Sequence, residues 1–257
     1  MENANTPTHG AGVLTWVWVH GYLGSSEIWG DLHTNLSQKH SIVTLDLPGF
    51  GNRAGEVSPD SIGGFADYVL QECTRRGIQT FGLMGHSMGG QISQEVAIRA
   101  PDRVKALVLY GTGPVGAMPG RFETIERSRE RLQEDGVTPT AMRIAAKWFV
   151  DLEASPPWAW VSKLAQGVSV ASADRCLKAM GDWRREDDLG SIQCPTQVIW
   201  GELDRSYAWP EQIKLWHGIK GVSMAVLPRC SHAAHLEAPA LFQKVVDDFC
   251  ELNARRD

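Results

Sequence analysis

A serine with glycines two residues before and after it is the first feature of this chain that could do chemistry. Residues 80–91 read TFGLMGHSMGGQ, which places Ser87 between Gly85 and Gly89, after an apolar run and before a helical pattern. A nucleophile on a sharp strand-to-helix turn has a strained backbone, so the residues two positions away must lack bulk. The turn also places the N–H of Met88 at a helix N-terminus, where it can stabilise an oxyanion. The alternative is a glycine-rich loop with a capping serine.

Two later residues have the types and positions that a serine nucleophile requires. Such a serine needs a general base, and the base needs a carboxylate that orients it. Asp204 and His232 each follow a predicted strand by a few residues, and parallel strands bring their carboxyl ends to one edge of a sheet. We therefore predict Ser87, Asp204 and His232 as catalytic residues. Glu202 is the alternative acid, but Asp204 lies further past the strand. His235 is the alternative base, but His232 lies nearer to its strand.

The loop after the first predicted strand supplies a second candidate oxyanion donor. Residues 20–26 read HGYLGSS, and the absence of a side chain at Gly21 lets the backbone approach a substrate. The backbone N–H groups of Tyr22 and Met88 then form the predicted oxyanion hole. The same loop is also consistent with a purely structural role, as a glycine turn before a serine that caps a helix. The two roles are compatible. The loop after the second predicted strand carries Arg53, a candidate contact for an acidic substrate.

Alternating apolar and amphipathic segments position these loops. The alternation is typical of a parallel sheet whose strands are joined by crossover helices. The predicted strands are residues 14–19, 41–45, 80–84, 104–110, 196–200 and 223–227. The predicted helices among them are residues 26–39, 61–76, 88–100, 209–217 and 239–252. The sequence therefore predicts an α/β fold with a mostly parallel central sheet of six to eight strands, flanked by helices.

The alternation stops in the middle of the chain. From about residue 114 to residue 190 no strand pattern appears, and four helical stretches lie near residues 121–134, 138–150, 158–166 and 173–185. A helical insertion between parallel strands predicts a cap over the carboxyl ends of the strands, where open α/β sheets bind ligands. We therefore predict two units. Residues 1–113 and 191–257 form the core, and residues 114–190 form a helical cap or lid.

The predicted cap is rich in tryptophan and in charged residues. Its aromatic side chains are first of all packing residues, but a cleft lined by some of them suits a cyclic or acyl substrate. We take Trp148 and Trp183 as candidate substrate contacts. The run 121–131 mixes arginine and glutamate, which is most simply a solvated helix face with i,i+3 and i,i+4 pairs.

Composition excludes several classes of function. The 257 residues carry a net charge of −5 and are 43% hydrophobic, which is ordinary for a soluble protein and gives no electrostatic case for nucleic-acid binding. No apolar run approaches the roughly 20 residues that span a bilayer, and the N-terminus shows no signal-peptide pattern. The five cysteines are scattered and odd in number, which favours reduced thiols and a cytoplasmic location.

Five motifs, taken in their order along the chain, resemble those of one superfamily. They are H-G-Y-L-G, D-L-P-G-F-G, G-H-S-M-G-G, G-E-L-D and S-H-A-A-H-L-E-A-P. The chain resembles the α/β-hydrolase superfamily over nearly its whole length outside the predicted cap. The resemblance implies an α/β-hydrolase fold with Ser87 as nucleophile, Asp204 as acid and His232 as base, in the family's chain order. It also implies oxyanion donors at Tyr22 and Met88.

At a finer level the chain resembles enol-lactone hydrolases, carbon–carbon bond hydrolases of aromatic catabolism, and small carboxylesterases. Residues 182–192 resemble the segment after the cap in the first two groups. Two positions depart from relatives. Ser231 stands where many relatives have glycine, and Gln91 stands where the menaquinone-pathway enzyme has an arginine that binds its acidic substrate. The short N-terminus resembles that of this menaquinone-pathway enzyme, which makes the cyclohexadiene carboxylate, but the departure at Gln91 argues against assigning the chain to it.

These features predict a serine hydrolase that cleaves a carboxylic ester or (enol-)lactone of a small organic acid through an acyl-enzyme on Ser87. One alternative keeps the triad but hydrolyses a carbon–carbon bond in a dienone, or eliminates from an acidic ring substrate. Another is a non-catalytic ligand-binding homologue. A metal site at His232 and His235 is a further alternative, but the sequence lacks the glutamate of an H-E-x-x-H pattern.

The predicted mechanism requires no metal and no organic cofactor. The expected partner is a small-molecule ester, lactone or diketone substrate, with no nucleic acid and no membrane. We expect the chain to act as a monomer or a homodimer.

Overall fold

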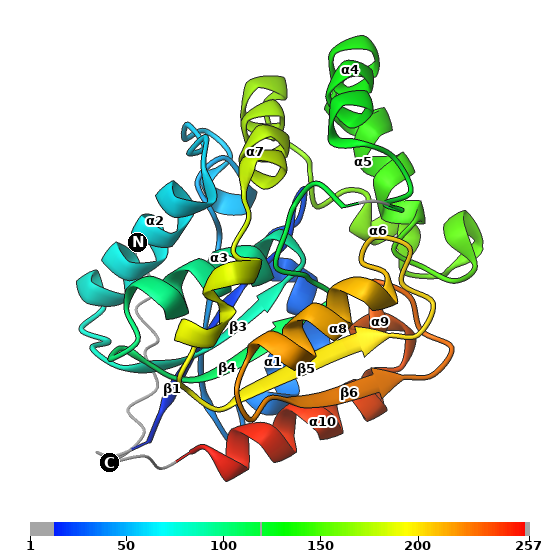
Figure 1. Cartoon of the computed structure of the whole chain (residues 1–257). Helices are drawn as coiled ribbons and strands as arrows, with labels where there is room; N and C mark the ends of the chain where they lie inside the picture. The colour runs from blue at the N-terminus through cyan, green and yellow to red at the C-terminus, as the bar shows by residue number, and fades with distance from the viewer. Residues whose placement is uncertain (1–12, 119, 255–257) are drawn as a thin grey trace.

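The computed structural model describes residues 13–118 and 120–254 of the chain, and the N-terminal stretch without a signal-peptide pattern lies outside them (Figure 1). Six strands of the described part form one sheet in which every pairing is parallel. Across the sheet they are β2 (Ser41–Leu45), β1 (Thr15–Val19), β3 (Phe81–His86), β4 (Val104–Tyr110), β5 (Thr196–Gly201) and β6 (Ser223–Leu227). The predicted α/β fold with a mostly parallel sheet is confirmed.

Helices cover both faces of the sheet. On one face α1 (Gly30–Leu36) contacts α10 (Pro239–Leu252), and α10 lies below the sheet in Figure 1. The helices on the other face are α2 (Ile62–Arg75), α3 (Met88–Arg99) and α8 (Trp209–Gly218). Because both faces are covered, every residue of β3 and of β5 is buried, and neither strand alternates between buried and exposed residues.

Local signals explain where the helices begin and end. The hydroxyl of Ser61 accepts a hydrogen bond from the N–H of Gly64 (3.1 Å), so α2 begins at the next residue, as an N-cap requires. The predicted helix 26–39 is instead divided into a 3₁₀ turn, η1 (Ser26–Trp29), and the short α1. Gly30 lies at the division with a φ of +41°, a value that interrupts a regular right-handed helix.

The residues between β4 and β5 are called the helical segment here and span 114–190. Its helices are α4 (Ile125–Asp135), α5 (Val137–Ala146), α6 (Trp158–Val161) and α7 (Val170–Asp182). In the described part of this segment the only β contact is an isolated bridge between Val115 and Arg184. The predicted helix 158–166 is shorter than expected, because residues after Val161 continue in tight turns up to Gly167, whose φ is +86°.

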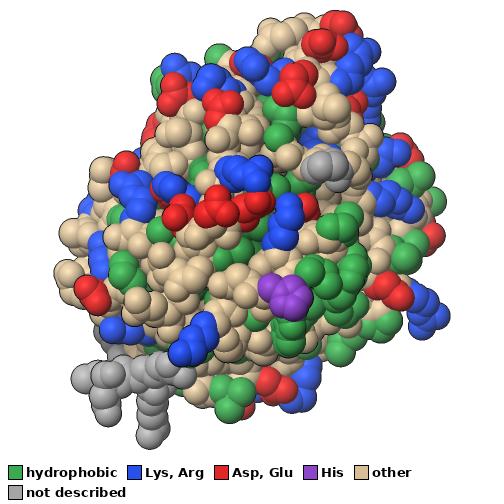
Figure 2. Space-filling view, in the orientation of Figure 1, with side chains coloured by type: hydrophobic (Ala, Val, Ile, Leu, Met, Phe, Trp, Pro, Cys, Tyr) green, Lys and Arg blue, Asp and Glu red, His purple; other side chains and the backbone are tan. Residues whose placement is uncertain are grey.

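Charge pairs hold the helical segment together. Arg129 on α4 binds Asp174 on α7 (2.8 Å), and Arg143 on α5 binds Glu123 in the loop before α4 (2.8 Å). Figure 2 shows acidic and basic side chains intermixed over the upper part of the molecule, where Figure 1 places α4 and α7. None of the helices in residues 13–118 and 120–254 is long and apolar enough to cross a membrane.

Candidate active site

Ser87 lies at the sharp turn between β3 and α3. Its φ of +57° and ψ of −118° are unfavourable for a residue with a side chain. Hydrogen bonds on both sides of the residue hold this conformation. The Ser87 N–H donates to the carbonyl of Tyr110 (2.9 Å), and the hydroxyl of Thr112 donates to the Ser87 carbonyl (2.8 Å). A strained serine at a strand-to-helix turn is the geometry of a nucleophile elbow.

The glycines around Ser87 have no room for a side chain. A Cβ added to Gly85 would lie 2.1 Å from the carbonyl oxygen of Gly89. A Cβ added to Gly89 would lie 2.2 Å from the carbonyl oxygen of Val19, and one on Gly21 would lie 2.9 Å from the Cβ of Ser87. The turn, the helix start and the loop after β1 therefore meet at backbone contact, which only glycine permits.

Asp204 and His232 form a buried pair at the ends of β5 and β6. The Nδ1 of His232 lies 2.8 Å from Oδ2 of Asp204, and the two side chains are 1% and 0% exposed. The other carboxylate oxygen accepts from the backbone N–H groups of Ser206 (2.7 Å) and Tyr207 (3.1 Å). The backbone thus fixes the carboxylate, and the carboxylate fixes the imidazole ring.

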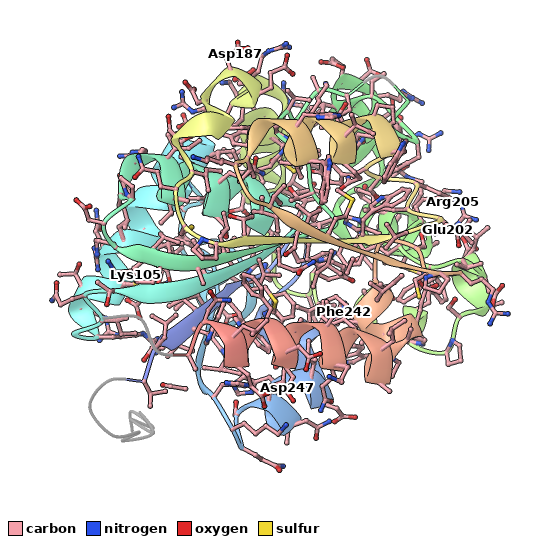
Figure 3. The ribbon with its side chains drawn as sticks, turned by 60° about the horizontal axis from the view of Figure 1, so that its bottom comes forward. Lys105, Asp187, Glu202, Arg205, Phe242 and Asp247 are labelled. Carbon is pink, nitrogen blue, oxygen red and sulfur yellow. The ribbon has the colours of Figure 1, made fainter. Side chains whose placement is uncertain are left out.

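The alternative acid and the alternative base have other partners. Glu202 accepts a hydrogen bond from the N–H of Arg229 (3.0 Å) and lies with Arg205 beyond the end of β5 (Figure 3). The Nε2 of His235 donates to the carbonyl of Ile28 (3.0 Å), and its Nδ1 lies in hydrogen-bond contact with the hydroxyl of Tyr110 (2.9 Å). Burial lowers the pKa of His235 to about 4. Both ring nitrogens are occupied, which leaves none for a substrate proton or a metal ion.

Ser87 and His232 line one narrow cleft beneath the helical segment. The cleft has a volume of about 30 Å³, which is room for about one water molecule. Its other walls include Tyr22 from the core and Ile144 and Trp148 from the helical segment. The predicted contact Trp148 is therefore at the site, with its ring centroid 5.6 Å from that of His232.

The loop after β1 is held by a histidine that is not part of the pair. Nδ1 of His20 donates to the carbonyl of Gly21 (2.8 Å), and Nε2 accepts from the N–H of Leu47 (3.1 Å). This pattern requires a neutral ring, and burial lowers the pKa of His20 accordingly. No described residue accepts a hydrogen bond from the backbone N–H of Tyr22 or of Met88. Both N–H groups are free to bind an oxyanion.

Two of the predicted substrate contacts do not lie at this cleft. Arg53 pairs with Glu56 (2.9 Å) and lies over the ring of Tyr68. The indole N–H of Trp183 donates to the carboxylate of Glu95 (3.0 Å) beneath the helical segment. Neither side chain is among those that line the cleft with Ser87.

Among the cleft residues that the sequence did not predict as substrate contacts are two with polar groups, Arg121 and Tyr207. The ring of Tyr207 stacks on that of His232 with centroids 5.9 Å apart and an angle of 16° between the rings. Burial raises the pKa of the Tyr207 hydroxyl, and hydrogen bonding with Ser87 and Thr112 acts against this shift. Arg121 lies before α4 rather than on it. Thr124 gives the signal, because its hydroxyl caps α4 and places the start of the helix after Arg121.

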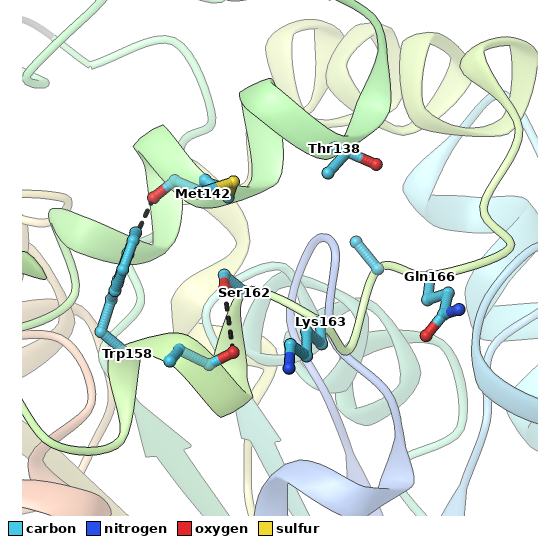
Figure 4. A pocket seen from close by; sticks show the side chains of 8 residues that line it. Thr138, Met142, Trp158, Ser162, Lys163 and Gln166 are labelled. Carbon is cyan, nitrogen blue, oxygen red and sulfur yellow. Dashed lines mark hydrogen bonds between the residues drawn. The ribbon is translucent and has the colours of Figure 1, made fainter.

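A larger cavity lies within the helical segment, away from Ser87. It has a volume of about 580 Å³ and lies between α5 and the chain from residue 158 to residue 166 (Figure 4). The indole N–H of Trp158 donates to the carbonyl of Met142 (3.0 Å) at its edge. Neither Ser87, Asp204 nor His232 lines this cavity, so we locate the candidate chemistry in the smaller cleft.

Comparisons with curated proteins identify relatives of this chain. A dihydrolipoyllysine-residue acetyltransferase component of an acetoin cleaving system from Pseudomonas putida is 31% identical over 243 residues. The match covers 89% of this chain but only 61% of that protein. A pimeloyl-(acyl-carrier protein) methyl ester esterase from Yersinia enterocolitica is 26% identical over 253 residues, which are 94% of this chain and 95% of that protein.

Comparison with solved structures gives the same fold. The enol-lactonase from Burkholderia xenovorans LB400 matches with a TM-score of 0.85 over 95% of this chain and 94% of that one. At 22% identity this likeness concerns the fold alone. A family model described as "Alpha/beta hydrolase family" matches residues 16–244, which is far more than half of the sequence. The chain belongs to the alpha/beta hydrolase family, and it is a hydrolase.

Proposed function

We propose that the protein is a serine hydrolase that cleaves a carboxylic ester or a lactone of a small organic acid. The observation that carries the proposal is the 2.8 Å bond between His232 Nδ1 and Asp204, in a cleft that Ser87 also lines. This bond occupies one ring nitrogen and leaves Nε2 for proton transfer with the serine. The arrangement supports nucleophilic catalysis by a triad.

The proposed reaction has two stages. His232 Nε2 takes the proton of the Ser87 hydroxyl while its oxygen attacks the substrate carbonyl, and the resulting imidazolium is stabilised by Asp204. The proton then passes to the leaving alcohol oxygen as the ester C–O bond breaks, which leaves an acyl group on Ser87. In the second stage His232 takes a proton from water, the hydroxide adds to the acyl carbon, and the acid is released as Ser87 regains its proton.

The negative oxygen of each tetrahedral intermediate needs hydrogen-bond donors. We assign this role to the backbone N–H groups of Tyr22 and Met88. Two observations support the assignment. Met88 is the first residue of α3, so its N–H has no partner within the helix, and Gly21 brings the loop of Tyr22 against Ser87. Donors of this kind typically contribute a factor of about 10² to 10³ to kcat.

We propose that the helical segment, residues 114–190, acts as the cap of this site. Arg121, Phe122, Ile144, Trp148 and Met180 come from it and line the cleft together with Ser87 and His232. A mostly apolar roof removes water from the reacting groups, which strengthens the electrostatic interactions among them. The name of one relative in sequence, a methyl ester esterase, supports an ester as the substrate.

The proposal is tested by labelling and turnover in the same protein preparation. We expect a fluorophosphonate probe to label the wild type and not Ser87→Ala. We expect hydrolysis of a panel of short methyl esters and lactones to fall by about 10⁴-fold or more in Ser87→Ala and in His232→Gln. Ser93→Ala is the matched control, because Ser93 is a buried serine on the same helix and should leave both readouts unchanged.

Equal labelling of the wild type and Ser87→Ala would overturn the role of Ser87. Labelling of Ser87 without turnover of any ester or lactone would overturn the assigned bond. In that case a dienol substrate whose ketonisation is followed by absorbance would identify the carbon–carbon hydrolase alternative. Ligand binding without labelling and without turnover would identify a binding protein.

A further inference from the structure

The cleft beside Ser87 contains a guanidinium group that the proposed triad does not use. Arg121 lines the cleft together with Tyr22 and Tyr207. Its Nη1 donates to the hydroxyl of Ser128 (3.1 Å) and to the backbone carbonyl of Glu123. Within residues 13–118 and 120–254, no carboxylate forms a salt bridge with it. A positive group at the wall of a narrow cleft is thus without an anionic partner of its own.

The positive charge around Arg121 exceeds the negative charge. The neighbouring carboxylate of Glu123 binds Arg143 (2.8 Å) and Arg131 (3.2 Å) and accepts from Ser128. Two guanidiniums therefore already bind this carboxylate, and that of Arg121 lies beside the same residue without a salt bridge to it. Burial lowers the pKa of Arg121. This is the direction expected when a cation loses its hydration and nearby anions do not fully replace it. Nη2 of Arg143 is buried and has no hydrogen-bond partner among the described residues.

The hydroxyl of Tyr22 gives a second and independent indication. It is buried and has no hydrogen-bond partner among the described residues, although its side chain lines the same cleft. An unsatisfied buried polar group carries a free-energy cost, so such a group in a cleft marks a position for a ligand atom. Burial raises the pKa of this hydroxyl, so it keeps its proton and acts as a donor.

The Tyr22 hydroxyl and the Arg121 guanidinium belong to the cleft in which the proposed reaction at Ser87 takes place. Tyr22 also supplies one of the proposed oxyanion donors through its backbone, so its hydroxyl is tied to the position of the reacting carbonyl. Arg121 reaches the cleft from the helical segment above. A ligand with a carbonyl at Ser87 and an anion at Arg121 would satisfy both groups once the cleft has widened to admit it.

We propose that the substrate carries a carboxylate that Arg121 and the Tyr22 hydroxyl bind, which makes it a monoester or lactone of a dicarboxylic acid. The guanidinium offers paired N–H donors that match the two oxygens of a carboxylate. This inference rests on the proposed function for the reacting bond, and it adds the charge at the other end of the substrate.

Turnover of a matched pair of esters tests the inference. Monomethyl glutarate and methyl pentanoate have acyl chains of the same length and differ in the terminal carboxylate. We expect the wild type to prefer the acidic ester in kcat/KM by about 10- to 100-fold, as charge-assisted hydrogen bonds allow. Arg121→Gln should abolish this preference, and Tyr22→Phe should reduce it. Arg53→Gln, which removes an arginine paired at the surface, should keep it.

A binding measurement separates this inference from the proposed function. We expect glutarate to protect the wild type from fluorophosphonate labelling and to raise its melting temperature, and we expect Arg121→Gln to show neither effect. Glutarate binding that depends on Arg121, in a protein that hydrolyses no ester and no lactone, would overturn the proposed function and support the anion site. Ester turnover with no acidic preference and no protection by glutarate would overturn the anion site alone.

Two further variants keep the test decisive if Arg121→Gln does not fold. Arg121→Lys keeps the charge but not the paired donors, and it should retain part of the preference. Tyr22→Phe keeps the backbone N–H and removes only the hydroxyl. An acidic preference equal to that of the wild type in both variants would overturn the proposal. Protection by inorganic phosphate as strong as that by glutarate would overturn the assignment of a carboxylate.

Discussion

The floor and the roof of the cleft are built in different ways. The floor consists of the three loops that carry Ser87, Asp204 and His232, and backbone contacts hold it in place. Ser87 is bonded through its main chain to Tyr110, and the carboxylate of Asp204 accepts two main-chain N–H groups. The roof is the helical segment, and charged side chains hold it together.

Because of this difference, the floor and the roof should differ in how strongly a single substitution changes the stability of the protein. A backbone contact at 2 Å admits no substitution, so the floor depends on a few positions where any side chain is excluded. A roof held by several exposed or half-exposed charge pairs shares its stability among many residues, each of which contributes little. We therefore expect single substitutions to destabilise the protein strongly in the floor and only weakly in the roof.

The largest expected effect is at a floor glycine. Gly89→Ala places a Cβ about 2.2 Å from the Val19 carbonyl, and the backbone must move to admit it. We expect a loss of about 4 kcal/mol in the free energy of unfolding, or no folded protein at all. Gly190→Ala in the helical segment is the matched control, because nothing lies within 4 Å of its added Cβ. Urea unfolding that shows equal stability for the two variants would remove the contrast between floor and roof.

The second expected effect is on how the free energy of unfolding changes as the pH falls. All eight histidines lie outside residues 114–190, and His235 is buried among the floor loops with its pKa lowered to about 4. Between pH 6.5 and pH 4 the unfolded chain binds a proton that folded His235 does not. Its stabilisation is therefore complete above pH 6.5 and is lost as the pH falls, by about 3 kcal/mol in total.

His235→Gln should reduce the slope of unfolding free energy against pH over this range, as measured by urea titrations from pH 7.5 to pH 4.5. His20 and His86 shift in the same direction and remain in the variant, so the difference isolates His235. The exposed His217 supplies the control, and His217→Gln should keep the slope of the wild type. A slope unchanged in His235→Gln would show that the buried ring is not the acid-sensitive group.

The smallest effect is expected where floor and roof meet. Arg205, next to Asp204, donates to the carbonyls of Phe149 (2.7 Å) and Val150 (3.3 Å) in the helical segment. Arg205→Ala should cost about 1 kcal/mol of unfolding free energy. Arg127→Ala removes an exposed pair with Glu130 on the outside of the roof, which solvent screens, so it should cost less unfolding free energy than Arg205→Ala. Chemical denaturation of both variants would sharpen the comparison, and a larger loss in Arg127→Ala would reverse it.

The floor could be predicted from the sequence because its constraints are local. The glycines around Ser87 and the loop positions after β5 and β6 can be read from a few adjacent residues. All six strands occur where the sequence predicts them, and the structure brings Ser87, Asp204 and His232 to the same edge of the sheet. Their catalytic roles stay a prediction until the labelling experiment is done.

The roof could not be predicted to the same extent because its side chains are directed by distant partners. Trp183 is turned away from the cleft by Glu95, which lies 88 positions earlier in the chain. Arg121 belongs to a run with helical charge spacing, which favoured a solvated face and concealed its place at the cleft.

The small volume of the cleft has a consequence for how affinity is to be interpreted. Because there is room for about one water molecule beside Ser87, we predict that a substrate binds only after the helical segment has moved. Measured affinity is then the product of an opening equilibrium and a binding equilibrium, and it falls below the intrinsic value by the fraction of open molecules. A substitution at the junction that raises this fraction strengthens apparent binding without a new contact to the ligand. We expect such a substitution to lower both KM and the melting temperature, because it weakens the contacts that keep the helical segment closed.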